Sequence, residues 1–284
     1  MNRTILITGA TSGLGLATAL ALASKPYNLI LTWRDQDKAD QLRHQLEDSH
    51  PVASISLVEL DLASFASIEA CFTTIQKDFS SIDVLFNNAG LYMDTRGKTA
   101  EGFEMTLGVN YIGPAYLTWL LLPLLRLGDQ PQILQMCSRA ALFGWFRDKP
   151  DLFERHPHGF RAYAASKRMQ LMLTISLADS FKAEGITVNA IHPGIVATSI
   201  WRGDSLLMRL LDRNKHKRYL SAASAAKAGL FLITNDTMRK VTGKFFENEG
   251  QEIKLSRRLT DHRRIARLVE RTKEAIRQKG GQTV

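Results

Sequence analysis

Cysteine is scarce in this chain of 284 residues, which contains only Cys71 and Cys137. Neither has a second cysteine or a histidine at metal-ligand spacing, so the sequence offers no disulfide framework and no zinc motif. Both are flanked by apolar residues, which favours two buried thiols that act as small hydrophobic side chains. We therefore expect a protein of a reducing compartment with no metal site.

We expect no secretory leader, and the sequence has no long apolar run. The first apolar run, Ile5–Ile7, begins too early to leave room for a secretory signal. The most apolar window, Ala115–Leu127, is interrupted by Pro123 and Arg126 and is shorter than the roughly 18 residues of a membrane span. We interpret it as a buried helix and predict a cytoplasmic protein.

Positive charge is concentrated at the end of the chain. Residues 251–284 contain ten Lys and Arg against four Asp and Glu, which supplies +6 of the formal net charge of +9. Such a segment could contact anionic lipid, so peripheral membrane contact stays open. No aromatic residue lies between the charges to stack on a base, so nucleic acid is not an expected partner. We predict a basic, partly helical C-terminal extension over 251–284.

Apolar runs alternate with helical stretches over residues 1–250. This pattern predicts a single-domain α/β fold, a Rossmann-type doubly wound parallel sheet with helices on both faces and ligands at the carboxyl ends of the strands. The expected strands are Thr4–Thr8, Asn28–Trp33, Ile55–Leu60, Ile82–Phe86, Gln132–Cys137 and Ile186–His192. The expected helices are Leu14–Ser24, Asp37–Asp48, Ser64–Phe79, Phe103–Leu127, Phe160–Glu184 and Ala222–Ile233.

A glycine-rich turn, Thr8–Gly15, lies between the first expected strand and the first expected helix. Glycine lets the backbone approach a pyrophosphate, whose charge is met by free N–H groups at the helix N-terminus. The two residues after Gly15 are apolar, where a triphosphate-binding loop needs Lys and Ser or Thr. The turn therefore predicts a dinucleotide rather than ATP.

The second strand ends in Thr32-Trp33-Arg34-Asp35, at the position that faces the adenosine ribose in such a fold. Arg34 can direct its fork of N–H donors to a 2′-phosphate, which favours NADP(H). Asp35 would favour NAD(H) if its side chain faced the ribose instead. We predict NADP(H) and keep NAD(H) as the alternative.

Five motifs occur in order along the chain: Thr8-Gly9-Ala10-x-x-x-Gly13-x-Gly15, Asp61-Leu62, Asn87-Asn88-Ala89-Gly90, Tyr163-Ala164-Ala165-Ser166-Lys167 and Pro193-Gly194. Together they resemble the short-chain dehydrogenase/reductase family over roughly residues 3–250. The Arg34-Asp35 ending and the longer C-terminal part are similar to the retinol dehydrogenase and protochlorophyllide reductase branch. The resemblance implies an oxidoreductase that transfers hydride between nicotinamide C4 and a carbonyl or alcohol.

Tyr163 and Lys167 are four residues apart in a helical stretch, so the ammonium can lie near the phenol. A nearby cation favours the phenolate, which would bring the phenol pKa down from about 10 and make Tyr163 a usable acid/base. By resemblance, Lys167 also binds the nicotinamide ribose, Ser138 positions the substrate oxygen, and Asn110 holds a relay water with its backbone. Ser138 could instead only cap a strand end, and Asn110 could be an ordinary helix residue.

The resemblance also implies a set of cofactor contacts. Asn88 among them could instead be purely structural. The predicted cofactor-binding residues are Gly9, Thr11, Ser12, Gly13, Leu14, Gly15, Arg34, Asp61, Leu62, Asn88, Ala89, Gly90, Tyr163, Lys167, Pro193, Gly194, Val196 and Thr198.

Two loops, at 139–162 and 197–220, are expected to form walls of an apolar substrate pocket. The first is longer than in compact members of the family and is rich in aromatic residues; the second contains an amphipathic stretch, Ser205–Leu211. The aromatic residues could instead only anchor a surface loop. His156 and His158 have no third ligand, so no metal is predicted. Candidate substrate contacts are Ser138, Leu142, Phe143, Tyr163 and Trp201.

Two further expectations concern the whole molecule. The resemblance implies a homodimer or homotetramer formed through the helices Phe103–Leu127 and Phe160–Glu184. A chain that binds NADP(H) as a sensor or scaffold without catalysis is the alternative function, although it would not need Ser138.

Overall fold

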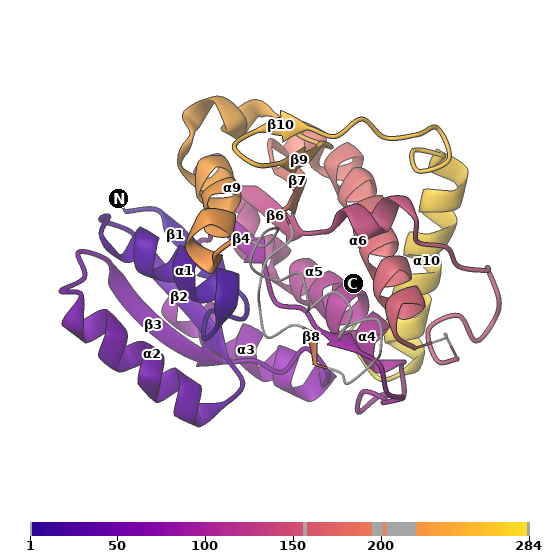
Figure 1. The fold of residues 1–284 in the computed structure, drawn as a ribbon, viewed down its shortest axis with the longest axis horizontal. Helices are drawn as coiled ribbons and strands as arrows, with labels where there is room; N and C mark the ends of the chain where they lie inside the picture. Colours follow the sequence, from indigo (N-terminus) through magenta and orange to yellow (C-terminus); the bar gives the residue numbers. More distant parts are fainter. Residues whose placement is uncertain (1, 156–157, 195–200, 203–219, 283–284) are drawn as a thin grey trace.

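The computed structural model describes residues 2–155, 158–194, 201–202 and 220–282. An eight-stranded sheet runs through the molecule in the order β10-β9-β7-β6-β4-β1-β2-β3 (Figure 1). Its strands are β1 (Thr4–Ile7), β2 (Asn28–Trp33), β3 (Ser54–Glu59), β4 (Val84–Asn87), β6 (Gln132–Met136), β7 (Thr187–His192), β9 (Phe245–Glu247) and β10 (Gln251–Glu252). The α-helices are α1 (Gly13–Ala23), α2 (Gln36–Asp48), α3 (Phe65–Asp78), α4 (Met105–Leu107), α5 (Gly113–Arg126), α6 (Phe160–Phe181), α9 (Ala222–Thr234) and α10 (His262–Gln278).

The predicted doubly wound fold is confirmed. All six predicted strands are present and mutually parallel, with ends shifted by two residues at most. Two short strands extend the sheet beyond the prediction, and β10 pairs with β9 in the antiparallel direction. Strands of two and three residues are too short to show a reliable apolar pattern in the sequence.

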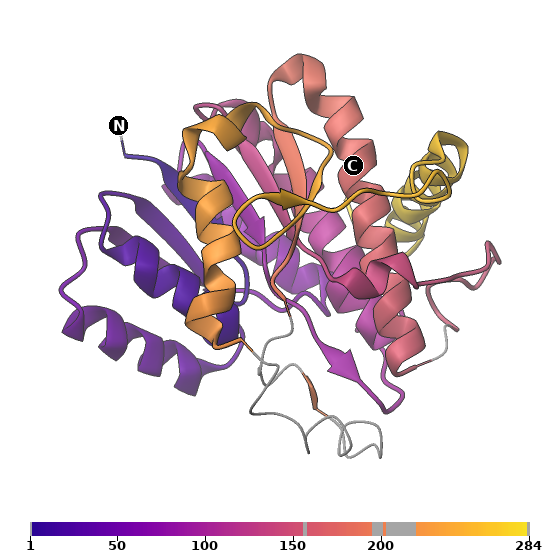
Figure 2. The ribbon, with the colours of Figure 1, turned by 45° about the horizontal axis from the view of Figure 1, so that its top comes forward.

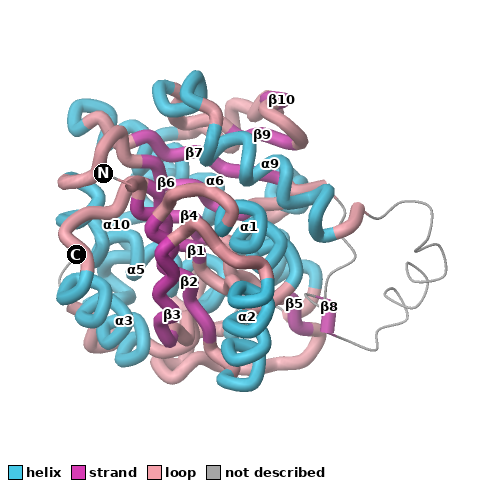
Figure 3. The backbone as a smooth tube through the Cα atoms, turned by 90° about the vertical axis from the view of Figure 1, so that its left-hand side faces the viewer, coloured by secondary structure: helices cyan, strands magenta, loops and turns pink. Residues whose placement is uncertain are grey.

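Helices cover both faces of the sheet (Figure 3). Apolar side chains of α1, α2 and α9 pack against one face. Those of α3, α5, α6 and α10 form the larger cluster on the other face. The N-termini of α2 and α3 are capped by Asp35 and Ser64, which satisfy backbone N–H groups that helices leave free. Both cysteines are buried and unpaired, as predicted.

The predicted helix Phe103–Leu127 is interrupted. It consists of α4, a π-helical turn η1 (Gly108–Ile112) and α5. Glycines at both joints allow close packing, because a Cβ at Gly108 would lie 2.2 Å from Thr99 Cγ2 and one at Gly113 would lie 2.4 Å from the Leu62 carbonyl oxygen. The stretch Met105–Arg126 is long and apolar enough to cross a membrane by length and composition, but 89% of its most apolar window is buried inside the protein. This matches the prediction of a buried core helix.

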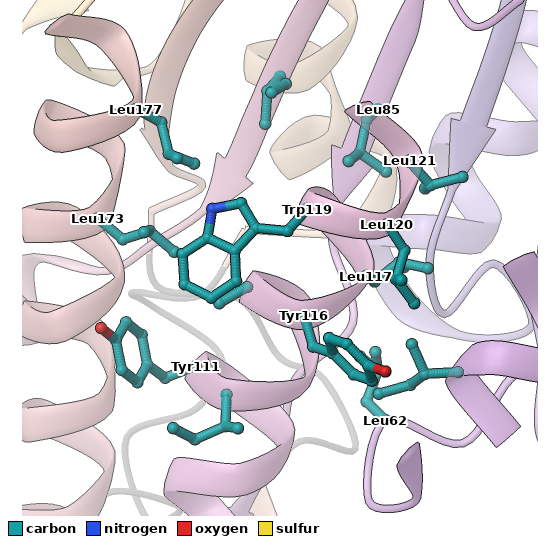
Figure 4. Close-up of a cluster of buried hydrophobic side chains, with 14 of the residues drawn as sticks. Leu62, Leu85, Tyr111, Tyr116, Leu117, Trp119, Leu120, Leu121, Leu173 and Leu177 are labelled. Carbon is teal, nitrogen blue, oxygen red and sulfur yellow. The ribbon is translucent and has the colours of Figure 1, made fainter. Parts of the chain in front are cut away.

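The C-terminal segment packs into the main core. Helix α10 lies beside α6 on the side away from the sheet (Figures 1 and 2). Its apolar side chains join the cluster that includes Trp119, Leu173 and Leu177, which meet between α5 and α6 (Figure 4). The Tyr111 hydroxyl lies 2.7 Å from the Thr272 hydroxyl, and Lys273 Nζ lies 5.6 Å from the Trp119 ring centroid. Helix α10 therefore covers part of the α5 and α6 surface that the sequence offered for self-association.

Candidate functional site

A cavity of about 510 Å³ opens at the carboxyl ends of β1, β2 and β4, where a doubly wound sheet places its ligands. Most of the predicted cofactor residues line it: Gly9, Thr11, Ser12, Gly13, Leu14, Gly15, Arg34, Asp61, Leu62, Asn88, Ala89, Gly90 and Pro193. The cavity also borders Thr32, Lys38, Tyr92, Met93, Met105, Val109 and Met136, which the sequence did not single out.

The glycine-rich turn is held tightly against its neighbours. Gly9 and Gly13 adopt positive φ angles of 66° and 55°, which glycine reaches without steric cost. A Cβ at Gly15 would lie 2.3 Å from the Gly9 carbonyl oxygen and 2.5 Å from Asn88 Nδ2. Because the first turn of α1 carries no acidic side chain, its free N–H groups and positive helix end can receive an anion. The turn therefore fits a pyrophosphate.

Asn88 braces this turn. Its Nδ2 donates to the carbonyl oxygen of Thr8 at 2.8 Å and to that of Gly9 at 3.3 Å. The Ala89 N–H donates to Thr8 Oγ1 at 3.0 Å. The structural alternative for Asn88 is therefore observed, while the residue also borders the cavity.

The two residues after β2 have different surroundings. Asp35 caps α2 by accepting from the Lys38 N–H at 3.3 Å, and its carboxylate lies 3.0 Å from Lys38 Nζ, so its pKa is lowered by these hydrogen bonds. Arg34 lies 3.8 Å from the Asp61 carboxylate with 55% of its side chain exposed. Both residues border the cavity, but the Asp35 carboxylate is engaged by its own helix, whereas the largely exposed Arg34 has only the longer contact with Asp61 among the described residues.

Ser138 and Tyr163 contact each other, but they do not line the described cavity, and neither do Lys167 and Gly194. Ser138 follows β6 and caps the short helix η2 (Arg139–Leu142) by accepting from the Ala140 N–H at 3.2 Å. Its side chain also hydrogen-bonds to Tyr163, which lowers the pKa of the phenol, but burial of the phenol outweighs this and raises its pKa to about 12. The cap and the contact with Tyr163 coexist.

Lys167 is buried and lies near Tyr163, with Nζ 6.0 Å from the ring centroid. Its ammonium donates to the Met136 carbonyl oxygen at 2.7 Å and to Gln170 Oε1 at 3.1 Å. Burial lowers the pKa of Lys167 to about 8. The predicted lowering of the Tyr163 pKa by Lys167 is not observed, because the ammonium points to these two acceptors and the phenol is buried.

Asn110 lies in the π-helical turn η1. Its Nδ2 donates to the Leu91 carbonyl oxygen at 2.9 Å and to Ser166 Oγ at 3.1 Å, and its Oδ1 accepts from the Leu91 N–H at 2.8 Å. A π-helical turn breaks the regular hydrogen-bond ladder, which is what a water-binding backbone carbonyl needs. A Cβ at Gly90 would lie 3.2 Å from Asn110 Oδ1 and 3.5 Å from Lys167 Nζ, so this cavity residue packs closely against both.

Tyr92 is a neighbour of the site that sequence reasoning missed. Its ring packs edge-on against Tyr163 with centroids 5.9 Å apart, and its hydroxyl donates to Asp94 Oδ1 at 2.5 Å. It belongs to β5 (Tyr92–Met93), which pairs with β8 (Trp201–Arg202) in a separate two-stranded sheet. A strand of two residues leaves no periodic signal, although its place two residues after Gly90 of the Asn88-Ala89-Gly90 motif is a signal that could have found it.

The predicted substrate loops are only partly described. Phe143 is 78% exposed, and neither it nor Leu142 borders the described cavity. Phe146 and Phe153 are buried in the core beside α10, so these two aromatic side chains anchor the loop, as the alternative interpretation held. Val196, Thr198, the stretch Ser205–Leu211, His156 and the side chain of Trp201 lie outside the described residues.

Comparison with known proteins agrees with this geometry. A family model described as short chain dehydrogenase matches residues 3–205. Human Retinol dehydrogenase 14 is 31% identical over 267 residues, which cover 88% of this chain and 80% of that protein. Human Retinol dehydrogenase 12 is 32% identical over 249 residues, covering 87% of this chain and 78% of the relative.

Solved structures share the fold. An uncharacterised protein from Mycobacterium paratuberculosis superposes with a TM-score of 0.75 and 26% identity, covering 99% of this chain and 95% of its own. An NADPH-bound carbonyl reductase from chicken fatty liver superposes with a TM-score of 0.69 at 23% identity, covering 89% of this chain and 99% of its own.

Proposed function

The chain belongs to the short-chain dehydrogenase family and is an oxidoreductase acting on alcohol or carbonyl groups, and we propose that it uses NADP(H) with Tyr163 as its acid/base. The observation that carries the proposal is the Ser138–Tyr163 hydrogen bond, next to Tyr92 of the cavity that the glycine-rich turn also borders. A nicotinamide bound there would supply the hydride at C4.

The four polar side chains take separate roles. The phenol of Tyr163, neutral at physiological pH because its pKa is about 12, donates a proton to the substrate oxygen during reduction. Ser138 orients that oxygen through its hydroxyl and stabilises the charge that develops on it. Lys167 supplies positive charge to the site below about pH 8, where its ammonium is protonated.

Proton resupply to Tyr163 would run through Lys167 and a water at the backbone of Asn110. The π-helical turn supports this role because its hydrogen-bond pattern departs from that of an α-helix at Asn110, and the Asn110 side chain is already held by Leu91 and Ser166. Oxidation follows the same route in reverse.

NADP(H) is favoured over NAD(H) because the side chains of Arg34 and Asp35 have different partners. The Asp35 carboxylate is occupied by the N-terminus of α2 and by Lys38, so it is poorly placed to accept from a ribose hydroxyl. Arg34 and Lys38 both border the cavity and together offer two cations to a 2′-phosphate. An NADPH-bound neighbour in the structural comparison supports the same choice.

We propose an apolar alcohol or carbonyl compound as substrate. Leu91, Met93, Met105, Val109 and Met136 border the cavity, and the relatives' name, retinol dehydrogenase, points to an apolar alcohol. We also propose that the protein is a cytoplasmic homo-oligomer that makes peripheral contact with membranes. Any homo-oligomer would need a surface that α10 leaves open.

Oxidation of NADPH and NADH with a panel of apolar aldehydes and ketones, retinal among them, tests the proposal. Tyr163→Phe should abolish turnover while NADPH binding, followed by its fluorescence, is retained. Tyr27→Phe is the matched control, because Tyr27 precedes β2 and lies at the opposite end of that strand from the cavity. Turnover that survives in Tyr163→Phe would remove the acid/base assignment. NADPH binding without turnover of any carbonyl would favour a sensor or scaffold.

A further inference from the structure

A row of buried amides lies behind Lys167. Gln170, one turn along α6, accepts from Lys167 Nζ with its Oε1 at 3.1 Å. Its Nε2 donates to Gln135 Oε1, also at 3.1 Å, across from α6 to β6. Gln135 and Gln170 are 0% and 1% exposed. Burying two amide side chains is costly unless they are hydrogen-bonded, so their mutual orientation is strongly constrained.

The row continues toward α5. Asn87 on β4 is the register partner of Gln135 on β6, and partners in parallel strands point to the same face. Asn87 Nδ2 donates to Thr118 Oγ1 at 2.9 Å. Within the described part of the chain, Asn87 Oδ1 and Gln135 Nε2 have no hydrogen-bond partner. A free acceptor and a free donor therefore stand at paired positions.

In the part of the chain that the structure describes, the hydrogen-bond acceptors of Lys167 are all neutral. Of its two hydrogen-bond acceptors, one is a main-chain carbonyl and the other is Gln170 Oε1. Among the described residues, the titratable groups that face it are Cys137, directly after β6, whose pKa burial raises to about 11, and Tyr163 on its own helix. Because both are neutral at physiological pH, carbonyl dipoles alone offset the burial of the ammonium.

We propose that Gln170 is a positioning residue that keeps the Lys167 ammonium charged and fixes its place beside Tyr163, with Gln135 fixing the direction of the Gln170 carbonyl. The inference rests on the proposed role of Lys167 in catalysis. An amide that donates to Gln135 must present its oxygen to Lys167, so the row sets which end of Gln170 faces the ammonium.

Two substitutions at Gln170 should act in opposite directions. Gln170→Leu removes one acceptor of a charge-assisted hydrogen bond, which should lower the pKa of Lys167 by about one unit or more. Gln170→Glu replaces the amide oxygen by a carboxylate at the same distance, which should raise the pKa of Lys167. Met172→Leu is the control, because Met172 is buried on the same helix and the exchange conserves volume.

The pKa of Lys167 is measured directly by NMR of the full chain labelled at lysine Cε, with the signal assigned by its loss in Lys167→Met. This readout needs no turnover, so it separates the inference from the proposed function. The second readout is the alkaline limb of the reductive kcat, which should move with the pKa in each variant. If the wild-type protein turned over no substrate, the proposed function would be refuted, but the NMR titration would still test the inference.

A titration of Lys167 that stays unchanged in both variants would overturn the inference. A shift in the same direction in both would also overturn it, since that result indicates only disturbed packing. If Gln170→Leu fails to fold, the direction of shift in Gln170→Glu decides. Gln135→Leu should reproduce the lowering in weaker form, because it frees the Gln170 amide to rotate.

Discussion

Replacing Gly15 by alanine tests the phosphate-binding turn, because two effects of opposite sign compete there. Gly15 lies in α1, where alanine is favoured over glycine by about 1 kcal/mol. The added Cβ, however, would lie 2.3 Å from the Gly9 carbonyl oxygen and 2.5 Å from Asn88 Nδ2. Main-chain atoms cannot give way as a flexible side chain would. The turn must therefore move.

The structure sets the size of the effect. Overpacking of this kind costs roughly 1–3 kcal/mol, and each Asn88 hydrogen bond to the turn contributes about 1 kcal/mol. Set against the helix propensity, the free energy of unfolding should fall by about 2 kcal/mol. For a chain of this size, that lowers the Tm by about 4–8 °C. Because the displaced N–H groups no longer converge on a phosphate, the Kd for NADPH should rise at least about tenfold.

Thermal unfolding followed by circular dichroism and NADPH fluorescence titration measure these two effects. The control is Gly229→Ala in α9, where the new Cβ would meet only the ring edge of Phe86, at 3.2 Å. It should leave NADPH affinity unchanged. If Gly15→Ala unfolds at the wild-type temperature and binds NADPH normally, the tight contact between Gly15, Gly9 and Asn88 does not shape the turn, and the assignment of the phosphate site fails.

Three more predictions address the cofactor, the buried lysine and the C-terminal helix. Arg34→Gln should raise the KM for NADPH about tenfold or more and leave that for NADH nearly unchanged; equal losses for both would contradict a 2′-phosphate contact. Burial lowers the pKa of Lys167 to about 8 from 10.5, so between these pH values the unfolded chain holds a proton that the fold releases. The unfolding free energy of the wild type relative to Lys167→Met should therefore rise from pH 8 to 10.5 in urea titrations, and a flat difference would show that Lys167 is not desolvated. Truncation after residue 260 should expose apolar surface on α5 and α6, lowering the Tm and promoting association in light scattering; a monomeric truncated chain of unchanged Tm would refute the packing role of α10.

The sequence alone determined six of the eight strands of the sheet and pointed to most of the residues that line the cavity. The runs Thr4–Thr8 and Asn28–Trp33 are largely apolar. This pattern arises from burial on both faces of the sheet, so it can be recognised without knowing which elements pack against the strands. The glycine-rich turn could also be recognised from the sequence, because its predicted role depends on backbone conformation and on its place between a strand and a helix. The resemblance implied that Ser138 and Tyr163 act on the same substrate oxygen, and in the structure their side chains are hydrogen-bonded.

Only the tertiary structure decided how these residues are held. The direction of the Lys167 ammonium depends on Gln170 and on the Met136 carbonyl oxygen, which no spacing rule brings together. The burial that raises the pKa of Tyr163 is likewise a property of the surrounding chain. The segment 251–284 looked like a basic extension because its charges dominate its composition, yet α10 buries one narrow apolar stripe that includes Leu268 and Ile276 against the core. Long-range packing sets these features, and it leaves only a weak local signal in the sequence.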